Sequence, residues 1–356
     1  MDMKPHDYAK QMQQTHNLTE ASMKNYRQTL THYSNLMELS LNELLIEAEK
    51  EEEEGIRWKH RTLRRRLIRY QNWLLSNYRY STAKDYLTKL KTFYYDHEIE
   101  IGKLPSMNKK QGNVSEPITY DDLPSKEVLR KAYNLGTPVF KAILLFTISS
   151  GCGKQEVLNL KLEDYYDWIS PYNVEQILSE EIDIVPTIRL RRQKTNKYYT
   201  TFCSPEAVRE IATYLQTRKD NDDRLFKISY RHLTQLFVNY NRLLKLGTIN
   251  DTGILRMHML RKFHASRLYN AENGLSLDEI DSLQGRSKNT IQQSYYFNST
   301  EDLKKKYIRN IEQVTILDQV HTITVDSPEV EMLKEKAAKI EELELLVKKI
   351  MERNQN

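Results

Sequence analysis

Cysteine, glycine and proline are scarce in this chain. Its 356 residues include 2 cysteines, 10 glycines and 9 prolines. Neither Cys152 nor Cys203 stands at the spacing of a metal ligand, and two cysteines cannot build a disulfide framework. We therefore expect both to be small buried hydrophobic residues. The scarcity of turn-forming residues argues against collagen-like and many-turned all-β proteins and favours long helices.

Long apolar runs are also missing. No segment approaches the roughly 18 apolar residues of a membrane span, and residues 1–16 contain no apolar signal-peptide core. We therefore expect a cytoplasmic protein without a membrane partner. The length of 356 residues suggests two or three domains, and the hydrophobic content of 39% is typical of a globular chain.

The chain has no large excess of charge of one sign, but its charge is segregated. It carries 54 Lys and Arg against 49 Asp and Glu, a net charge of +5. Residues 57–69 contain seven Lys and Arg and no acid, directly after the acidic run 49–54. A solvated helix face is one interpretation of this basic run, and contact with nucleic-acid phosphates is the other. The candidate phosphate contacts are Arg57, Lys59, Arg64, Arg65 and Arg66.

Apolar residues recur at helical spacing from about residue 18 to residue 104. The pattern predicts a compact helical bundle that includes a helix over 62–77 and another over 81–98, with Ser81 as N-cap. Residues 105–120 lose this periodicity and gather Pro, Gly, Asn and Ser, as an interdomain linker does.

The predicted domains are an N-terminal helical domain over 1–104, the linker over 105–120, a larger domain over 121–320 and a C-terminal tail over 321–356. In the larger domain we expect helices over 122–135 and 138–150, and the second is apolar on all sides and therefore buried. Residues 182–202 predict a small β-hairpin around the polar turn 193–197. Ser204 as N-cap opens a helix through residue 215, and helices resume to about residue 320.

The tail repeats apolar residues over about three heptads between residues 330 and 353. Such a short repeat pairs with another helix, docks onto its own domain or onto a neighbouring subunit, or stays a frayed tail.

The most informative region runs from residue 258 to residue 296. His258 and Arg261 lie three residues apart on a predicted helix, so both side chains emerge on one side near its N-terminal end. Together they would make an anion site. A surface histidine near an arginine is the plainer interpretation of this motif taken alone.

These motifs resemble those of the tyrosine recombinases or integrases, especially the branch found in archaea and their viruses and mobile elements. The resemblance rests on H-M-L-R at 258–261 and on L-Q-G-R-S-K-N-T at 283–290, followed by Tyr295 nine residues after Arg286. It also rests on S-S-G-C-G-K-Q-E at 149–156 and R-R-Q-K-T at 191–195. The implied fold is mainly α with a small β-hairpin, in which a helical, SAM-like core-binding domain is joined to a catalytic domain. The implied enzyme cuts and rejoins DNA through a covalent tyrosyl phosphodiester.

The resemblance implies a role for each matching residue. Tyr295 would be the nucleophile, with the adjacent Tyr296 as the alternative. Its phenol, with an ordinary pKa of about 10, needs cations and proton acceptors around it before it attacks a phosphate. Arg261 would stabilise the transition-state charge with its planar fork of N–H donors. His258 would donate a hydrogen bond to the phosphate or transfer a proton, and Lys194, with Lys197 nearby, would protonate the leaving oxygen.

Two positions depart from the family pattern. Where the family has its first catalytic arginine, this chain offers Lys154, or Gly153 if the alignment slips by one residue. A lysine keeps the charge but loses the bidentate fork. Arg286 stands where the family usually has His or Trp, and it can still donate to a phosphate oxygen. Glu156 resembles the acidic residue that buttresses this site.

The implied partner is double-stranded DNA, with four subunits assembled in synapsis and no nucleotide cofactor or metal required. One alternative is a recombinase-fold DNA-binding protein with impaired or lost catalysis, and another is an RNA- or DNA-binding module without catalysis. A metal-dependent nuclease is disfavoured because the region lacks clustered acids. Type IB topoisomerases use the same types of catalytic residue as the tyrosine recombinases.

Overall fold

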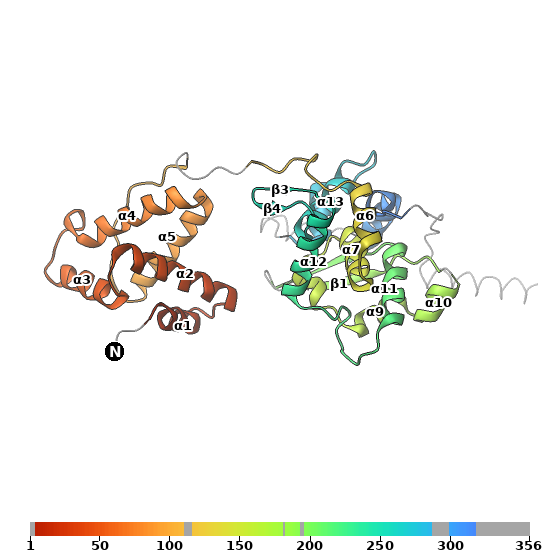
Figure 1. Ribbon diagram of the computed structural model, residues 1–356, viewed down its shortest axis with the longest axis horizontal. Helices are drawn as coiled ribbons and strands as arrows, with labels where there is room; N and C mark the ends of the chain where they lie inside the picture. The colour runs from red at the N-terminus through yellow and green to blue at the C-terminus, as the bar shows by residue number, and fades with distance from the viewer. Residues whose placement is uncertain (1–3, 110–115, 181, 193–195, 287–298, 318–356) are drawn as a thin grey trace, which may run out of the picture. The chain divides into compact units, whose positions relative to one another are not determined.

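The computed structural model describes residues 4–109, 116–180, 182–192, 196–286 and 299–317 (Figure 1). The chain divides into two compact units, Met1–Pro117 and Ile118–Asn356. The predicted coiled-coil repeat over 330–353 lies outside the described residues. No helix in the described ranges is both long enough and apolar enough to span a membrane.

The N-terminal unit is a helical bundle. Its helices are α1 (Pro5–Thr15), α2 (Glu20–Met37), α3 (Leu41–Glu53), the 3₁₀ turn η1 (Trp58–His60), α4 (Thr62–Asn77) and α5 (Tyr80–Tyr95). The predicted helix over 62–77 is confirmed residue for residue. Ser81 as N-cap is wrong, because the N-cap is Arg79 and Ser81 lies in the first turn. The helix starts earlier since Tyr80 packs against the hydrophobic core of the unit.

Buried tyrosines form the centre of this bundle. Tyr33, Tyr70 and Tyr94 come from α2, α4 and α5 and are fully buried. The hydroxyl oxygens of Tyr33 and Tyr94 lie 3.0 Å apart in a hydrogen bond, so neither polar group is buried without a partner. Tyr70 of α4 is therefore a core residue of the bundle.

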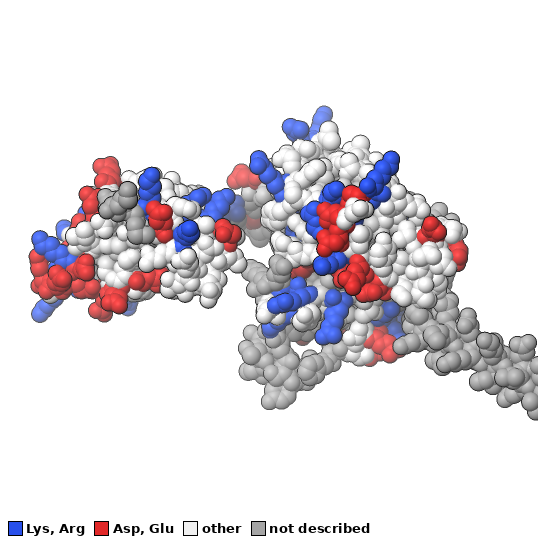
Figure 2. Space-filling model, turned by 90° about the horizontal axis from the view of Figure 1, so that it is seen from below, with Lys and Arg blue, Asp and Glu red and all other residues white. Residues whose placement is uncertain are grey.

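Part of the basic run is neutralised by α3. Arg66 pairs with Glu47 through two hydrogen bonds, Nε to Oε1 at 3.0 Å and Nη2 to Oε2 at 2.7 Å. Arg61 Nη1 lies 2.6 Å from Glu52 Oε1. Figure 2 shows acidic and basic side chains intermingled on the surface of this unit. Glu47 and Glu52 of α3 thus compensate two charges of the basic run, and only Glu52 belongs to the acidic run 49–54.

The second unit contains the larger core. Its elements are α6 (Lys126–Leu135), α7 (Pro138–Ser150), α8 (Lys154–Leu158), α9 (Leu162–Ile169), α10 (Val174–Ser179), β1 (Thr187–Arg192), β2 (Lys197–Phe202), α11 (Pro205–Thr217), α12 (Tyr230–Leu243), β3 (Thr248–Ile249), β4 (Thr252–Gly253), α13 (Met257–Tyr269), α14 (Leu277–Leu283), α16 (Thr300–Arg309) and the 3₁₀ turn η3 (Ile311–Val314).

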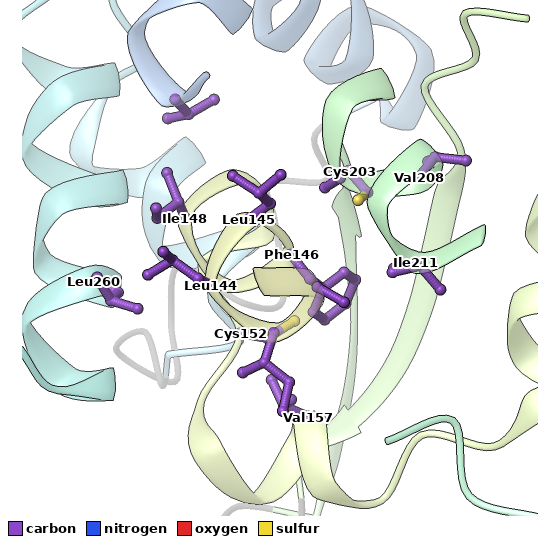
Figure 3. Packing of buried hydrophobic residues seen from close by; sticks show 14 of the residues in the cluster. Leu144, Leu145, Phe146, Ile148, Cys152, Val157, Cys203, Val208, Ile211 and Leu260 are labelled. Atoms are coloured by element: carbon purple, nitrogen blue, oxygen red, sulfur yellow. The ribbon is translucent and has the colours of Figure 1, made fainter. Parts of the chain in front are cut away.

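Helix α7 runs through the middle of this unit. Every residue from Ala142 to Ser150 is buried, as the all-round apolar pattern predicts. In Figure 3, Leu144 of α7 lies toward Leu260 of α13, whereas Phe146 lies toward Ile211 of α11. Cys152 and Cys203 are fully buried and free, which confirms their predicted role as small hydrophobic residues. The helix predicted over 122–135 begins only at Lys126, because Asp122 accepts hydrogen bonds from Thr119 in a preceding turn.

Strands β1 and β2 form the predicted hairpin, with Thr187 opposite Phe202 and Arg192 opposite Lys197. A second hairpin, whose strands β3 and β4 have two residues each, was not predicted. Ser204 is the N-cap residue of α11, as predicted, but the helix continues to Thr217. The fold class, mainly α with a small β-hairpin, is confirmed.

The last described segment, 311–317, is tied to α6 and α11. Lys126 and Arg130 of α6 donate to the carbonyl oxygens of Glu312 and Ile316. The carboxylate of Glu206, in the first turn of α11, accepts from the backbone N–H of Ile316 at 3.0 Å and of Leu317 at 2.9 Å. These hydrogen bonds fix residues 312–317 against the two helices.

Candidate active site

Arg261 is the most deeply placed cation of the candidate site. It lies on α13, is only 7% exposed, and packs between the ends of two other helices. Its Nη1 donates to the carbonyl oxygen of Gly151, at the end of α7, at 2.7 Å, and its Nη2 donates to that of Gln284, at the end of α14. Burial lowers the pKa of Arg261, and Arg192 lowers it further. The guanidinium nevertheless stays protonated, so the site holds a fixed positive charge.

Gly151 allows His264 and Gln284 to pack against the end of α7. Its φ of +64° lies in the left-handed region, which ends α7, and a Cβ here would come within 2.5 Å of His264 Nδ1. His264 is fully buried, and burial lowers its pKa to about 3. The imidazole is therefore neutral, and its Nδ1 lies 3.0 Å from the amide nitrogen of Gln284, which donates to it. That contact assigns the remaining proton to Nε2.

His258 stands at the exposed start of α13. Partial burial of its ring lowers its pKa, and the charges of four cations, Lys262, Arg256, Arg261 and Arg286, lower it further. Since the ordinary pKa of histidine is 6.5, His258 is neutral at pH 7 in the free protein. A bound anion would offset the four cations and raise that pKa.

A pocket of about 660 Å³ is lined by residues of α13, α8, α12 and the β3–β4 hairpin. Its basic lining residues are Lys154, Arg242, Arg256, His258 and Arg261, and its acidic lining residue is Asp251. Such a lining, in which one sign of charge prevails, attracts anions. The structure therefore brings together three of the residues that the sequence predicts for catalysis, Lys154, His258 and Arg261.

Lys154, the first residue of α8, points toward α12. Its Nζ lies 3.6 Å from the centre of the Tyr230 ring and donates to Thr234 Oγ1. Burial lowers its pKa. Gly153, the alternative position, has no side chain, and a Cβ there would lie 2.2 Å from Glu156 Oε2, so the Glu156 carboxylate would have to move to admit one.

Arg286 lies beside the pocket. Its Nη1 is 3.2 Å from Asp281 Oδ1, and its charge acts on His258. Arg286 is also the last residue before the segment 287–298. The predicted nucleophile Tyr295, its alternative Tyr296 and the predicted general acid Lys194 lie outside the described residues.

The predicted phosphate contacts in the N-terminal unit differ in availability. Arg57, Lys59 and Arg65 are exposed, and Arg64 is half-buried. Arg66 is half-buried and held by Glu47. The basic run thus combines exposed charges with charges that an acidic partner already compensates.

Sequence reasoning missed Arg256 and Arg192. Arg256, the N-cap of α13, donates to the carbonyl oxygens of Thr252 and Gly253 and lines the pocket. Arg192, at the end of β1, contacts Glu156 and the carbonyl oxygen of Gly285. For Arg192 the signal was present, because it belongs to the quoted R-R-Q-K-T motif.

No protein-family model matches the chain, and no curated protein matches it either. Among solved structures, the chain is similar to a lambda integrase(75-356) dimer bound to a COC′ core site, at 12% identity over 83% of this chain and 98% of that one, with a TM-score of 0.47. It is similar to XerH site-specific recombinase bound to difH substrate in a pre-cleavage complex, at 15% identity over 68% and 69%, with a TM-score of 0.44. It is also similar to XerA recombinase, at 16% identity over 86% and 97%, with a TM-score of 0.34.

Proposed function

We propose that this chain is a site-specific DNA recombinase that cleaves and rejoins DNA strands through a 3′-phosphotyrosine intermediate. The observation that carries the proposal is the pocket at the start of α13, where Lys154, His258 and Arg261 meet. These side chains come from helices α8 and α13, separated by about a hundred residues of sequence. Their convergence on one anion-attracting pocket is what phosphoryl transfer requires.

Arg261 suits the stabilisation of a phosphate in the transition state. Two hydrogen bonds to backbone carbonyls hold its guanidinium in place. Arginine has five N–H donors, so further donors remain for the non-bridging oxygens that gain charge during attack. A donor set that is already fixed stabilises this charge without reorganising.

His258 and Lys154 add a proton-transfer group and a second cation. The lowered pKa of His258 keeps its imidazole neutral at pH 7, a form that can accept a proton from an attacking phenol or donate its own N–H to a phosphate oxygen. Lys154 contributes a point charge without the fork of an arginine. Arg286, Tyr295 as nucleophile and Lys194 as general acid complete the catalytic set in this proposal.

The partner in this proposal is double-stranded DNA, acted on in the cytoplasm by several copies of the chain, four in synapsis. The N-terminal unit would serve as the core-binding domain and the second unit as the catalytic domain. The exposed Arg57, Lys59 and Arg65 support a DNA-facing surface on the N-terminal unit. Assignment to the archaeal and mobile-element branch stays a prediction from the motifs.

A second candidate function is DNA binding by the same fold with impaired or lost catalysis. Two contacts favour it. Glu156 occupies the space of a side chain at Gly153, and Lys154 is engaged with Tyr230 and Thr234. Both would weaken the cationic set relative to an enzyme with an arginine at this place.

Covalent capture separates the two candidates. The protein, Tyr295→Phe and Tyr296→Phe are incubated with nicked or 5′-phosphorothiolate DNA that carries a candidate attachment site, and denaturing gels are scored for a protein–DNA adduct. We expect an adduct in the unmodified protein and in Tyr296→Phe, and none in Tyr295→Phe. Tight DNA binding without any adduct on these trapping substrates would favour the second candidate.

A further inference from the structure

Arg192 occupies a specific position at the end of β1, immediately before the turn of the hairpin. Its side chain is 22% exposed, and its Nε lies 3.7 Å from Oε1 of Glu156, a carboxylate that is itself only 10% exposed. Its Nη1 donates to the carbonyl oxygen of Gly285 at 2.7 Å. Arg192 thus links the start of α8 to the turn that follows α14.

The turn after α14 is held at two successive carbonyls. Arg261 binds the carbonyl oxygen of Gln284 and Arg192 binds that of Gly285. Gly285 has a φ of +57°, and a Cβ on it would lie 2.5 Å from the Tyr199 ring. Two guanidinium groups and one aromatic ring therefore fix the backbone from which Arg286 extends.

The arrangement carries an electrostatic cost that packing alone would not require. Arg192 is close enough to Arg261 for its charge to lower the pKa of that buried guanidinium. Like charges repel more strongly where burial lowers the effective dielectric constant, and the opposing effect of Glu156 on the pKa of Arg261 is smaller than that of Arg192. An apolar residue at position 192 would fill the space without the repulsion, so the arginine serves the carbonyl contact.

We propose that Arg192, held by Glu156, is a positioning residue that fixes the Gln284–Gly285 turn and thereby holds Arg286 in place beside the pocket. This inference rests on the proposed function for its effect on DNA cleavage. A second consequence is independent of the proposed function: when the turn is loosened, the charge of Arg286 acts less strongly on the pKa of His258.

The test compares Arg192→Gln and Arg192→Lys with Arg189→Gln. Arg189 lies on the same strand and is exposed, with its guanidinium 5.3 Å from the Tyr198 ring, so the control removes the same charge without touching the turn. The first readout is the rate of adduct formation on the trapping DNA. The second is the pKa of His258 in the free protein, measured by NMR titration and assigned with His258→Gln.

We expect Arg192→Gln to slow adduct formation by roughly 10²-fold, the scale of a misplaced reacting group, with DNA affinity equal to that of Arg189→Gln. The pKa of His258 should rise in both Arg192 variants. A rise in Arg192→Lys identifies the turn as the cause, because that variant keeps the charge but cannot hold Glu156 and Gly285 together. Glu156→Gln should reproduce both effects and serves if Arg192→Gln does not fold.

Adduct rates and a His258 pKa equal to those of Arg189→Gln would overturn the inference. If the unmodified protein forms no adduct on any substrate, the proposed function fails while the His258 titration still decides the role of Arg192. If the adduct forms and depends on Tyr295 but not on Arg192, the proposed function stands and the inference falls.

Discussion

The carboxyl group of Glu206 should make the stability of the second unit depend on pH. Glu206 is 7% exposed and accepts backbone hydrogen bonds from Ile316 and Leu317. Burial raises its pKa to about 7, although those hydrogen bonds and the charges of Lys126 and Arg209 act in the opposite direction. The groups that face it therefore reduce the effect of burial without cancelling it.

The magnitude follows from proton linkage. A pKa of about 7 against an ordinary value of 4.5 corresponds to about 3 kcal/mol, since one pKa unit is worth about 1.4 kcal/mol. The folded state binds this proton more tightly than the unfolded state does. The free energy of unfolding should therefore fall as pH rises from about 4.5 to about 7, with the loss from this group complete above about 7.

Denaturant unfolding at pH 5, 6, 7 and 8 measures this effect by comparison of the unmodified protein with Glu206→Gln. The variant cannot ionise at position 206, so its stability should decline less over this range. Glu312→Gln, which changes an exposed carboxyl in the same segment, is the control and should behave like the unmodified protein. Parallel stability curves for the unmodified protein and Glu206→Gln would refute the reasoning.

Two further predictions concern the glycine at the end of α7 and the basic run. Gly151→Ala should lower the free energy of unfolding by about 2–5 kcal/mol, because a positive φ costs about 1–2 kcal/mol and contact with His264 adds overpacking of about 1–3 kcal/mol. Gly247→Ala, where φ is +77° and no atom lies within 4 Å of the added Cβ, should show only the smaller cost in the same denaturant titration. Replacing Arg57, Lys59 and Arg65 together by Gln should flatten the salt dependence of DNA binding by about 0.9 in the log–log slope for each DNA phosphate that the variant no longer neutralises. Arg66→Gln should change that slope less, since Glu47 already holds Arg66. Fluorescence anisotropy over a salt series measures both slopes, and an equal change in the two variants would contradict this prediction.

Much of the fold could be predicted from local sequence, because its strongest signals are local. Apolar spacing predicts α4 to the residue, and Pro138 with an unbroken apolar run predicts α7. The β3–β4 hairpin was missed although Asn250 and Asp251, both at positive φ, mark its turn. Each of its strands has only two residues, too short for an alternating pattern.

The candidate site was predictable only in part. The spacing of His258 and Arg261 follows from one helix, so their proximity could be predicted. The contact of Lys154 with Tyr230 and Thr234 spans about 80 residues of sequence, and that of Arg192 with Gly285 spans 93. Contacts at such separations depend on how α12 and α14 pack, and no local pattern encodes them.

The buried state of both cysteines makes this chain suited to distance measurement by fluorescence. Cys152 and Cys203 are fully enclosed in the second unit, and burial raises the pKa of both thiols, that of Cys152 to about 11. The thiolate is the form that reacts with maleimide dyes, so both native thiols should stay unlabelled in the folded protein. Ser76→Cys on α4 and Gln216→Cys on α11 introduce one exposed thiol in each unit. Energy transfer between dyes at these two positions would then follow the separation of the two units as DNA is added, in a protein that keeps all its native cysteines.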